Sequence, residues 1–203
     1  MELHTTLTSP FGKMARIVIL EKGLSDRVSV IEAKTRTIDS PYYKINPSGR
    51  VPYLLLDDAS GLEESQLICA YLDHLVGPPM LDHPGGAVGW ESRRLESLAR
   101  SMLDGVSVWS RELYRPENER SPTIIAHEMA RARRMIDNWE TEITNPLMSG
   151  DLNMAQLTLA VTLQIEPGLE GFDFRATHAN LNAWAARLST RPSFQKIIPQ
   201  LAG

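Results

Sequence analysis

Cysteine, paired histidines and long apolar runs are scarce or missing in this chain of 203 residues. Cys69 is its one cysteine, which excludes an internal disulfide and a CxxC redox or zinc site. The five histidines are scattered, with no pair at ligand spacing on one helix face, so we expect no metal. Because no apolar run approaches the length of a membrane span, we also expect no contact with a membrane.

The motifs of several common enzyme classes are missing as well. The chain has no G-x-S-x-G elbow, no G-x-G-x-x-G, no P-loop and no H-E-x-x-H. Its net charge is only −4, and the arginines between 131 and 134 alternate with apolar positions on an expected helix, which argues against nucleic-acid binding. The first residues show neither a basic region nor an apolar signal segment, so we expect a cytoplasmic protein.

The first part of the chain shows the pattern of an α/β domain. β-rich runs at 3–7 and 27–33 flank a segment with apolar residues at helical spacing, which Gly23 is placed to end. A short hairpin and a further helix follow from residue 52. This order of elements predicts a βαβ-ββα domain.

The rest of the chain has the pattern of an all-α domain. Breaker residues cluster in the Gly-Pro-Pro and Pro-Gly-Gly triplets of the stretch 77–88, which we expect to be a linker. Beyond it, long stripes of apolar residues recur every three or four positions, as in a helical bundle. We therefore predict a first domain at 1–76 and an all-helical domain at 89–203.

One later segment is apolar on nearly all sides and is expected to be the central buried helix of the second domain. Asn153 precedes it, and Gln156 follows three residues later. This spacing is that of a capping box, in which each side chain satisfies a free N–H of the first turn.

The stretch from Asn46 to Leu72 combines a turn, a short strand and the start of a helix. Pro52 stands at the start of the strand, where it cannot donate a ladder hydrogen bond, and a cis Val51–Pro52 bond is the sharpest shape it could give the backbone. The main-chain groups of Val51 could then face outward and pair with an extended peptide.

The helix that follows offers two complementary groups. Ser65 stands where an N-cap is expected, and the free N–H groups there would bind a carboxylate. Glu64 is a natural acceptor for an ammonium. Together they suit the amino-acid end of a small peptide, although these two residues alone would be better explained as a helix cap.

These residues resemble the glutathione-site signature of the glutathione transferase family. The matching runs are Asn46-Pro47-x-Gly49-Arg50-Val51-Pro52 and Leu62-x-Glu64-Ser65-x-x-Ile68-x-x-Tyr71-Leu72. The resemblance implies a thioredoxin-like first domain, a cis Pro52 and a two-fold homodimer. It also implies that Val51 binds the cysteinyl backbone of glutathione and that Glu64 and Ser65 bind its γ-glutamyl end.

Ser9 is the candidate catalytic residue. It is the expected N-cap of the first helix, with Pro10 at the first helical position. A free thiol has a pKa of about 8.5, and a hydroxyl that donates to the sulfur at the positive end of a helix lowers it. Ser9 also occupies the place of the family's catalytic Ser, Cys or Tyr, and a serine cannot form a mixed disulfide. Three other hydroxyls stay open as the sulfur donor, those of Thr5, Thr6 and Thr8.

Further ligand contacts are expected at basic and apolar residues. The glycyl carboxylate of glutathione could be held by Arg50, Lys34 or Lys44. A hydrophobic electrophile would need an apolar pocket, for which the candidates are Phe11, Met102, Val106 and Trp109.

The expected function is therefore that of a glutathione transferase in detoxification. Glutathione is the co-substrate, its thiolate attacks a hydrophobic electrophile, and peroxide reduction is a second activity open to a serine-type site. Two alternatives remain, namely a non-catalytic protein that binds glutathione or apolar ligands, and an adaptor of the same fold that binds a partner protein.

Overall fold

The computed structural model describes residues 1–82 and 85–202. It divides into two compact units, Met1–Leu81 and Asp82–Gly203. The predicted linker, 77–88, spans the division, and its residues 83 and 84 lie outside the described residues, as does residue 203 of the predicted second domain. Within the described ranges, no helix combines the length and the apolar character needed to cross a bilayer.

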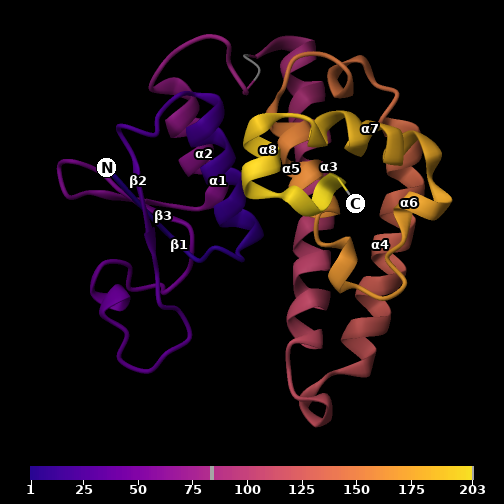
Figure 1. Cartoon of the computed structure of the whole chain (residues 1–203), viewed down its shortest axis with the longest axis horizontal. Helices are drawn as coiled ribbons and strands as arrows, with labels where there is room; N and C mark the ends of the chain where they lie inside the picture. Colours follow the sequence, from indigo (N-terminus) through magenta and orange to yellow (C-terminus); the bar gives the residue numbers. More distant parts are fainter. Residues whose placement is uncertain (83–84, 203) are drawn as a thin grey trace. The chain divides into compact units, whose positions relative to one another are not determined.

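The first unit is a four-stranded sheet with two helices packed side by side on it (Figure 1). The sheet has the order β2-β1-β3-β4, with β1 parallel to β2 and antiparallel to β3, and with β3 antiparallel to β4. Its elements are β1 (Glu2–Thr5), α1 (Pro10–Glu21), β2 (Ser29–Glu32), β3 (Tyr53–Leu55), β4 (Gly61–Glu63) and α2 (Ser65–His74). This confirms the predicted βαβ-ββα order. Leu3 and Leu54, which lie opposite each other on β1 and β3, are fully buried.

The second unit is all helical. Its longest helices, α3 (Gly86–Leu113) and α4 (Pro122–Glu142), pack along each other (Figure 1). The helix α5 (Met154–Leu163) is buried at every residue and packs on α3, which confirms that it is the central helix. Shorter α-helices follow, namely α6 (Phe174–Thr177), α7 (Ala179–Ser189) and α8 (Pro192–Ile197).

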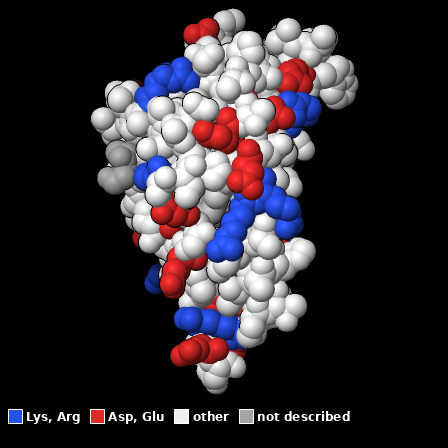
Figure 2. Space-filling model, turned by 90° about the vertical axis from the view of Figure 1, so that its right-hand side faces the viewer, with Lys and Arg blue, Asp and Glu red and all other residues white. Residues whose placement is uncertain are grey.

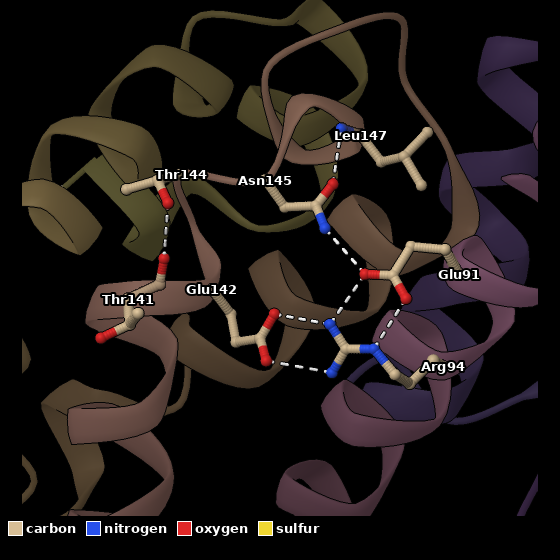
Figure 3. Close-up of polar contacts among 7 residues, drawn as sticks. All are labelled: Glu91, Arg94, Thr141, Glu142, Thr144, Asn145 and Leu147. Carbon is tan, nitrogen blue, oxygen red and sulfur yellow. Dashed lines mark hydrogen bonds and ion pairs between the residues drawn. The ribbon is translucent and has the colours of Figure 1, made fainter.

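An arginine joins the two long helices of the second unit (Figure 3). Arg94 of α3 binds Glu142 of α4 through two hydrogen bonds of 3.0 and 2.7 Å, and binds Glu91 through two of 2.8 Å. The amide of Asn145 donates to Glu91 as well, at 2.8 Å. The hydrogen bonds to Glu91 and Glu142 raise the pKa of Arg94. The hydrogen bond that Glu91 accepts from Arg94 lowers the pKa of Glu91. The start of α3 and the end of α4 are thereby fixed to each other.

The expected capping box before α5 is only half correct. Asn153 accepts from the N–H of Gln156 at 3.1 Å, as predicted. The side chain of Gln156 does not return to the Asn153 N–H. Its amide donates instead to the carbonyl oxygens of Leu147 at 2.8 Å, Asp151 at 3.1 Å and Gly150 at 3.4 Å. The preceding loop folds over the helix start and presents three acceptors there, which local spacing cannot reveal.

A buried ion pair extends the first unit to Leu81. Lys22, at the end of α1, lies 2.9 Å from Asp73 of α2, and both side chains are almost completely buried. The Lys22 ammonium also donates to the carbonyl oxygens of Gly77 at 2.6 Å and Pro79 at 2.7 Å, while Asp73 accepts from the N–H of Leu81 at 3.0 Å. These bonds hold the segment after α2 against both helices.

Candidate functional site

Ser9 is the N-cap of α1, as the sequence predicts. Its backbone is extended (φ −62°, ψ 119°), its Oγ accepts from the N–H of Gly12 at 3.2 Å, and Pro10 is the first helical residue. A hydroxyl that accepts still has its own hydrogen to donate. Since Ser9 is partly exposed and the positive end of the helix dipole lies there, this position can stabilise an anion.

The three threonine alternatives are not equally accessible. Thr5 is fully buried, and its hydroxyl donates to the main-chain oxygen of Thr6 at 3.2 Å. A Cβ at Gly12 would collide with the Thr5 hydroxyl, so α1 lies directly against this side chain. Thr5 is therefore closed to a ligand, whereas Thr6 is partly exposed and Thr8 is exposed.

The turn before β3 is fixed by its own side chains. Asn46 accepts from the N–H of Ser48 at 3.1 Å, and the Ser48 hydroxyl accepts from the N–H of Arg50 at 3.1 Å. Gly49 has a φ of 67°, a conformation that glycine adopts without strain. The Val51–Pro52 bond that follows is cis, as the family resemblance implied.

The main-chain groups of Val51, the next residue of this turn, are available for hydrogen bonding. The residue is partly exposed, and within the described ranges its N–H and C=O have no hydrogen-bond partner. Pro52, next in the chain, is buried and leads into β3. The main chain of Val51 can therefore pair with an extended peptide by strand addition.

Ser65 is the first residue of α2 and not its N-cap, which corrects the prediction. The N-cap is Glu64, which makes no side-chain capping bond and has a φ of 74° and a ψ of 121°. Because β4 ends at Glu63, a single residue must turn the chain from strand to helix, and Glu64 takes the strained conformation that this requires. Such strain costs roughly 1–3 kcal/mol and is concentrated at functional sites.

Among the three basic candidates, Arg50 forms an ion pair with Glu64. Its Nη1 lies 3.7 Å from Oε1 of Glu64, and both side chains are largely exposed. Lys34 and Lys44 are exposed too; the carbonyl of Lys34 accepts from the Ser40 hydroxyl at 2.6 Å. The structure thus brings Glu64, the candidate for the γ-glutamyl end, together with one of the three candidates for the glycyl end.

Sequence reasoning missed two further cations on α1. Lys13 lies one turn after Ser9, with its N–H bonded to the Ser9 carbonyl at 2.9 Å, and Nη1 of Arg16 lies 3.5 Å from the Leu7 carbonyl oxygen. Burial lowers the pKa of both groups, and the charge of Arg16 lowers that of Lys13 further. Their spacing of four and seven residues from Ser9 was the signal that could have found them.

The predicted electrophile residues differ in exposure. Phe11, in the first turn of α1, is partly exposed. Met102, Val106 and Trp109 of α3 are each about 1% exposed, and the Trp109 ring meets Phe172 edge to face at 6.2 Å. This burial favours a packing role over ligand contact for the three α3 residues.

Charged residues of both signs lie on the face of the second unit that carries α4, α6 and α7. Figure 2 shows basic and acidic residues interspersed there. In the part of the chain that the structure describes, no group of three or more His, Cys, Asp or Glu is placed to hold a metal ion. The candidate residues that remain are Ser9, Val51 and Glu64 of the first unit.

Comparison with known proteins identifies the domain that carries these residues. Residues 8–75, which include Ser9, Val51 and Glu64, match the family of the glutathione S-transferase N-terminal domain. The first unit therefore carries a glutathione S-transferase N-terminal domain, and the whole chain is similar to glutathione transferases. The expected family resemblance is confirmed, together with the fold class of an α/β thioredoxin-like domain followed by a helical one.

Three relatives illustrate the similarity. The uncharacterized GST-like protein YibF of Escherichia coli (strain K12) is 27% identical over 162 residues, which is 79% of each chain. Glutathione S-transferase 2 of Saccharomyces cerevisiae is 26% identical over 212 residues, covering 98% of this chain and 89% of that protein. A glutathione transferase family member from Pseudomonas fluorescens Pf-5, solved with bound glutathione, superposes with a TM-score of 0.87 at 24% identity and covers 97% of both chains.

Proposed function

We propose that this protein is a glutathione transferase that activates the glutathione thiol with Ser9 and transfers it to a hydrophobic electrophile. The observation that carries this proposal is the Ser9 hydroxyl at the start of α1, which keeps a hydrogen to donate. The glutathione bound to the Pseudomonas fluorescens relative supports the choice of co-substrate.

Each end of the peptide has a proposed partner in the first unit. The Val51 main chain pairs with the cysteinyl residue, as in strand addition to a sheet edge. Glu64 binds the γ-glutamyl ammonium, and the start of α2 at Ser65 binds its carboxylate. The ion pair with Glu64 favours a place for Arg50 at this same end, so Lys34 and Lys44 are the better candidates for the glycyl carboxylate.

The chemistry follows from stabilising a negative charge on sulfur. The thiol loses its proton to solvent, and the Ser9 O–H and the positive end of α1 stabilise the thiolate. Lys13 and Arg16 add positive potential on the same helix. The thiolate then forms a carbon–sulfur bond with the electrophile, which releases a leaving group or takes up a proton. Phe11 contributes apolar surface for that substrate.

The wider role is proposed on the same family relationship. We expect a cytoplasmic homodimer that removes reactive electrophiles, with peroxide reduction as a second reaction of the same thiolate. An adaptor that binds a partner protein is the alternative that would apply if glutathione does not bind.

A pair of matched serine variants tests this function. Ser9→Ala removes the proposed donor, whereas Ser121→Ala removes the equivalent N-cap of α4, whose Oγ accepts from the Ile124 N–H at 3.4 Å. Both should lose about 1 kcal/mol of stability as cap variants. Only Ser9→Ala should lower kcat with a standard aryl halide, by about 100-fold.

Glutathione binding measured by calorimetry separates the alternatives. Retained binding with lost turnover in Ser9→Ala supports the enzyme. Turnover and binding that are equal in both variants would contradict the role of Ser9 and favour a binding protein. No glutathione binding by the wild-type protein would favour the adaptor.

A further inference from the structure

Two buried side chains hold one carbonyl group next to the proposed peptide site. The main-chain oxygen of Arg50 accepts a hydrogen bond from the amide of Asn46 at 3.0 Å and another from the phenol of Tyr42. The Asn46 amide also lies 3.3 Å from the Tyr42 oxygen. Tyr42 is 5% exposed and Asn46 is 2% exposed, so these donors face the protein interior.

Planarity of the peptide unit transmits this restraint to Val51. The Arg50 carbonyl and the Val51 N–H belong to one peptide unit, which is trans, and in such a unit the two groups point in opposite directions. A carbonyl that is held inward therefore turns the Val51 N–H outward. The Arg50 N–H is bonded to Ser48, so Val51 provides the first donor of this segment that has no partner within the described ranges.

The position of Tyr42 is fixed by a hydrogen bond and a ring contact. It lies in the short 3-10 helix Pro41–Lys44, where its N–H donates to the Ser40 hydroxyl at 3.3 Å. Its ring centroid lies 5.9 Å from that of His4 on β1. Burial raises the pKa of Tyr42, so the phenol keeps its proton at neutral pH and remains a donor.

We propose that Tyr42 and Asn46 are positioning residues for glutathione, which fix the Arg50 carbonyl so that the Val51 N–H meets the cysteinyl main chain. This inference rests on the proposed function, because it assigns a cause to the orientation of Val51. Neither side chain touches the peptide. They set the direction of the Val51 N–H, which does contact the peptide. Tyr42 lies before the run Asn46–Pro52 that carries the family resemblance, so that run does not include it.

The test compares two neighbouring tyrosines. Tyr42→Phe removes only the phenol oxygen that bonds to Arg50. Tyr43→Phe is the matched control, since Tyr43 is the next residue, its ring lies 6.4 Å from that of Tyr42, and it makes no O–H hydrogen bond within the described part of the chain. Asn46→Asp is a second variant, which keeps the acceptor for Ser48 but replaces the donor to Arg50 with a carboxylate oxygen.

Glutathione binding and hydrogen exchange of the Val51 amide are the readouts. We expect glutathione to slow exchange of this amide in the wild-type protein and in Tyr43→Phe. In Tyr42→Phe the Kd for glutathione should rise about fivefold, as for the loss of one hydrogen bond, and protection of the Val51 amide should fall. Asn46→Asp should show a larger rise. The thiol pKa of bound glutathione should stay at the wild-type value, because Ser9 is untouched.

The outcomes separate the inference from the function on which it rests. If Tyr42→Phe and Asn46→Asp bind glutathione and protect the Val51 amide as the wild-type protein does, the positioning role is wrong while the proposed function stands. If the thiol pKa changes in parallel with the Kd, the effect is a general disturbance of the site and the positioning role is again wrong. If the wild-type protein itself does not bind glutathione, the proposed function fails, and the inference with it.

Discussion

The helices α1 and α2 begin in opposite ways, although both starts belong to the same proposed site. At α1, Ser9 satisfies a first-turn N–H with its own oxygen and remains unstrained. At α2, Glu64 provides no side-chain cap and holds a φ of 74°. In our proposal, the Ser9 hydroxyl hydrogen at the first start bonds to a sulfur atom, and the second start binds a ligand carboxylate. The start of α1 is therefore unstrained, whereas the start of α2, where we propose that the ligand carboxylate binds, holds a strained residue.

The largest effect is expected where the two helices are joined. Lys22→Met should lower the free energy of unfolding by about 3–5 kcal/mol, because it leaves Asp73 buried without its cation. Lys44→Met, at an exposed lysine, should change it by less than about 0.5 kcal/mol. Urea denaturation measures both. A loss below about 1 kcal/mol for Lys22→Met would show that the pair does not hold α1 and α2 together.

The start of α5 provides a third case, in which a side chain donates away from its helix. Gln156→Glu should destabilise the protein by about 3 kcal/mol at neutral pH, because a buried carboxylate would face three carbonyl oxygens. These surroundings would raise the pKa of the new carboxyl in the folded state, so the penalty should shrink as the pH falls through that pKa. The exposed Gln195→Glu is the control. A penalty that does not depend on pH would contradict the assigned direction of the amide.

The smallest effect on stability, and the one of opposite sign, is expected at Glu64. Glu64→Gly should raise the free energy of unfolding by about 1 kcal/mol, since glycine adopts a φ of 74° without strain. It should also weaken glutathione binding by about tenfold or more, because the proposed ammonium partner is lost. Thermal denaturation and calorimetry measure the two quantities.

Ala59→Gly is the matched control for the opposite effects that Glu64→Gly should have on stability and on glutathione binding. Ala59 has a φ of 67° in the turn between β3 and β4, away from the proposed ligand contacts. It should gain stability in the same way and bind glutathione as the wild-type protein does. Equal binding by both glycine variants would remove Glu64 from the site.

Prediction from the sequence was most accurate where a short local pattern decides the structure. Ser9 followed by Pro10 specifies a helix start by itself, and the order of strands and helices follows from apolar periodicity. The assignment of Ser65 as a cap was wrong because β4 continues to Glu63, which pairs with Tyr53 of β3, and this leaves one residue for the turn.

Contacts between distant residues could not be predicted in this way. Lys22 meets Asp73 across two helices, and Gln156 meets carbonyl groups of a loop whose path depends on the packing of the second unit. No sequence motif contains both Tyr42 and Arg50. The hydrogen bond from the Tyr42 phenol to the Arg50 carbonyl depends on how the 3-10 helix Pro41–Lys44 packs against the turn before β3. In each case the side chain was visible in the sequence but its partner was not.

The account depends on Ser9 donating to the glutathione sulfur, and the pKa of the bound thiol tests this most directly. Thiolate absorbance of bound glutathione can be titrated with pH in the wild-type protein and in the Ser9→Ala variant. We expect the wild-type midpoint to lie at least about one pKa unit below the free value of about 8.5, and that of Ser9→Ala to return close to it. The same midpoint in both proteins would contradict the role of Ser9.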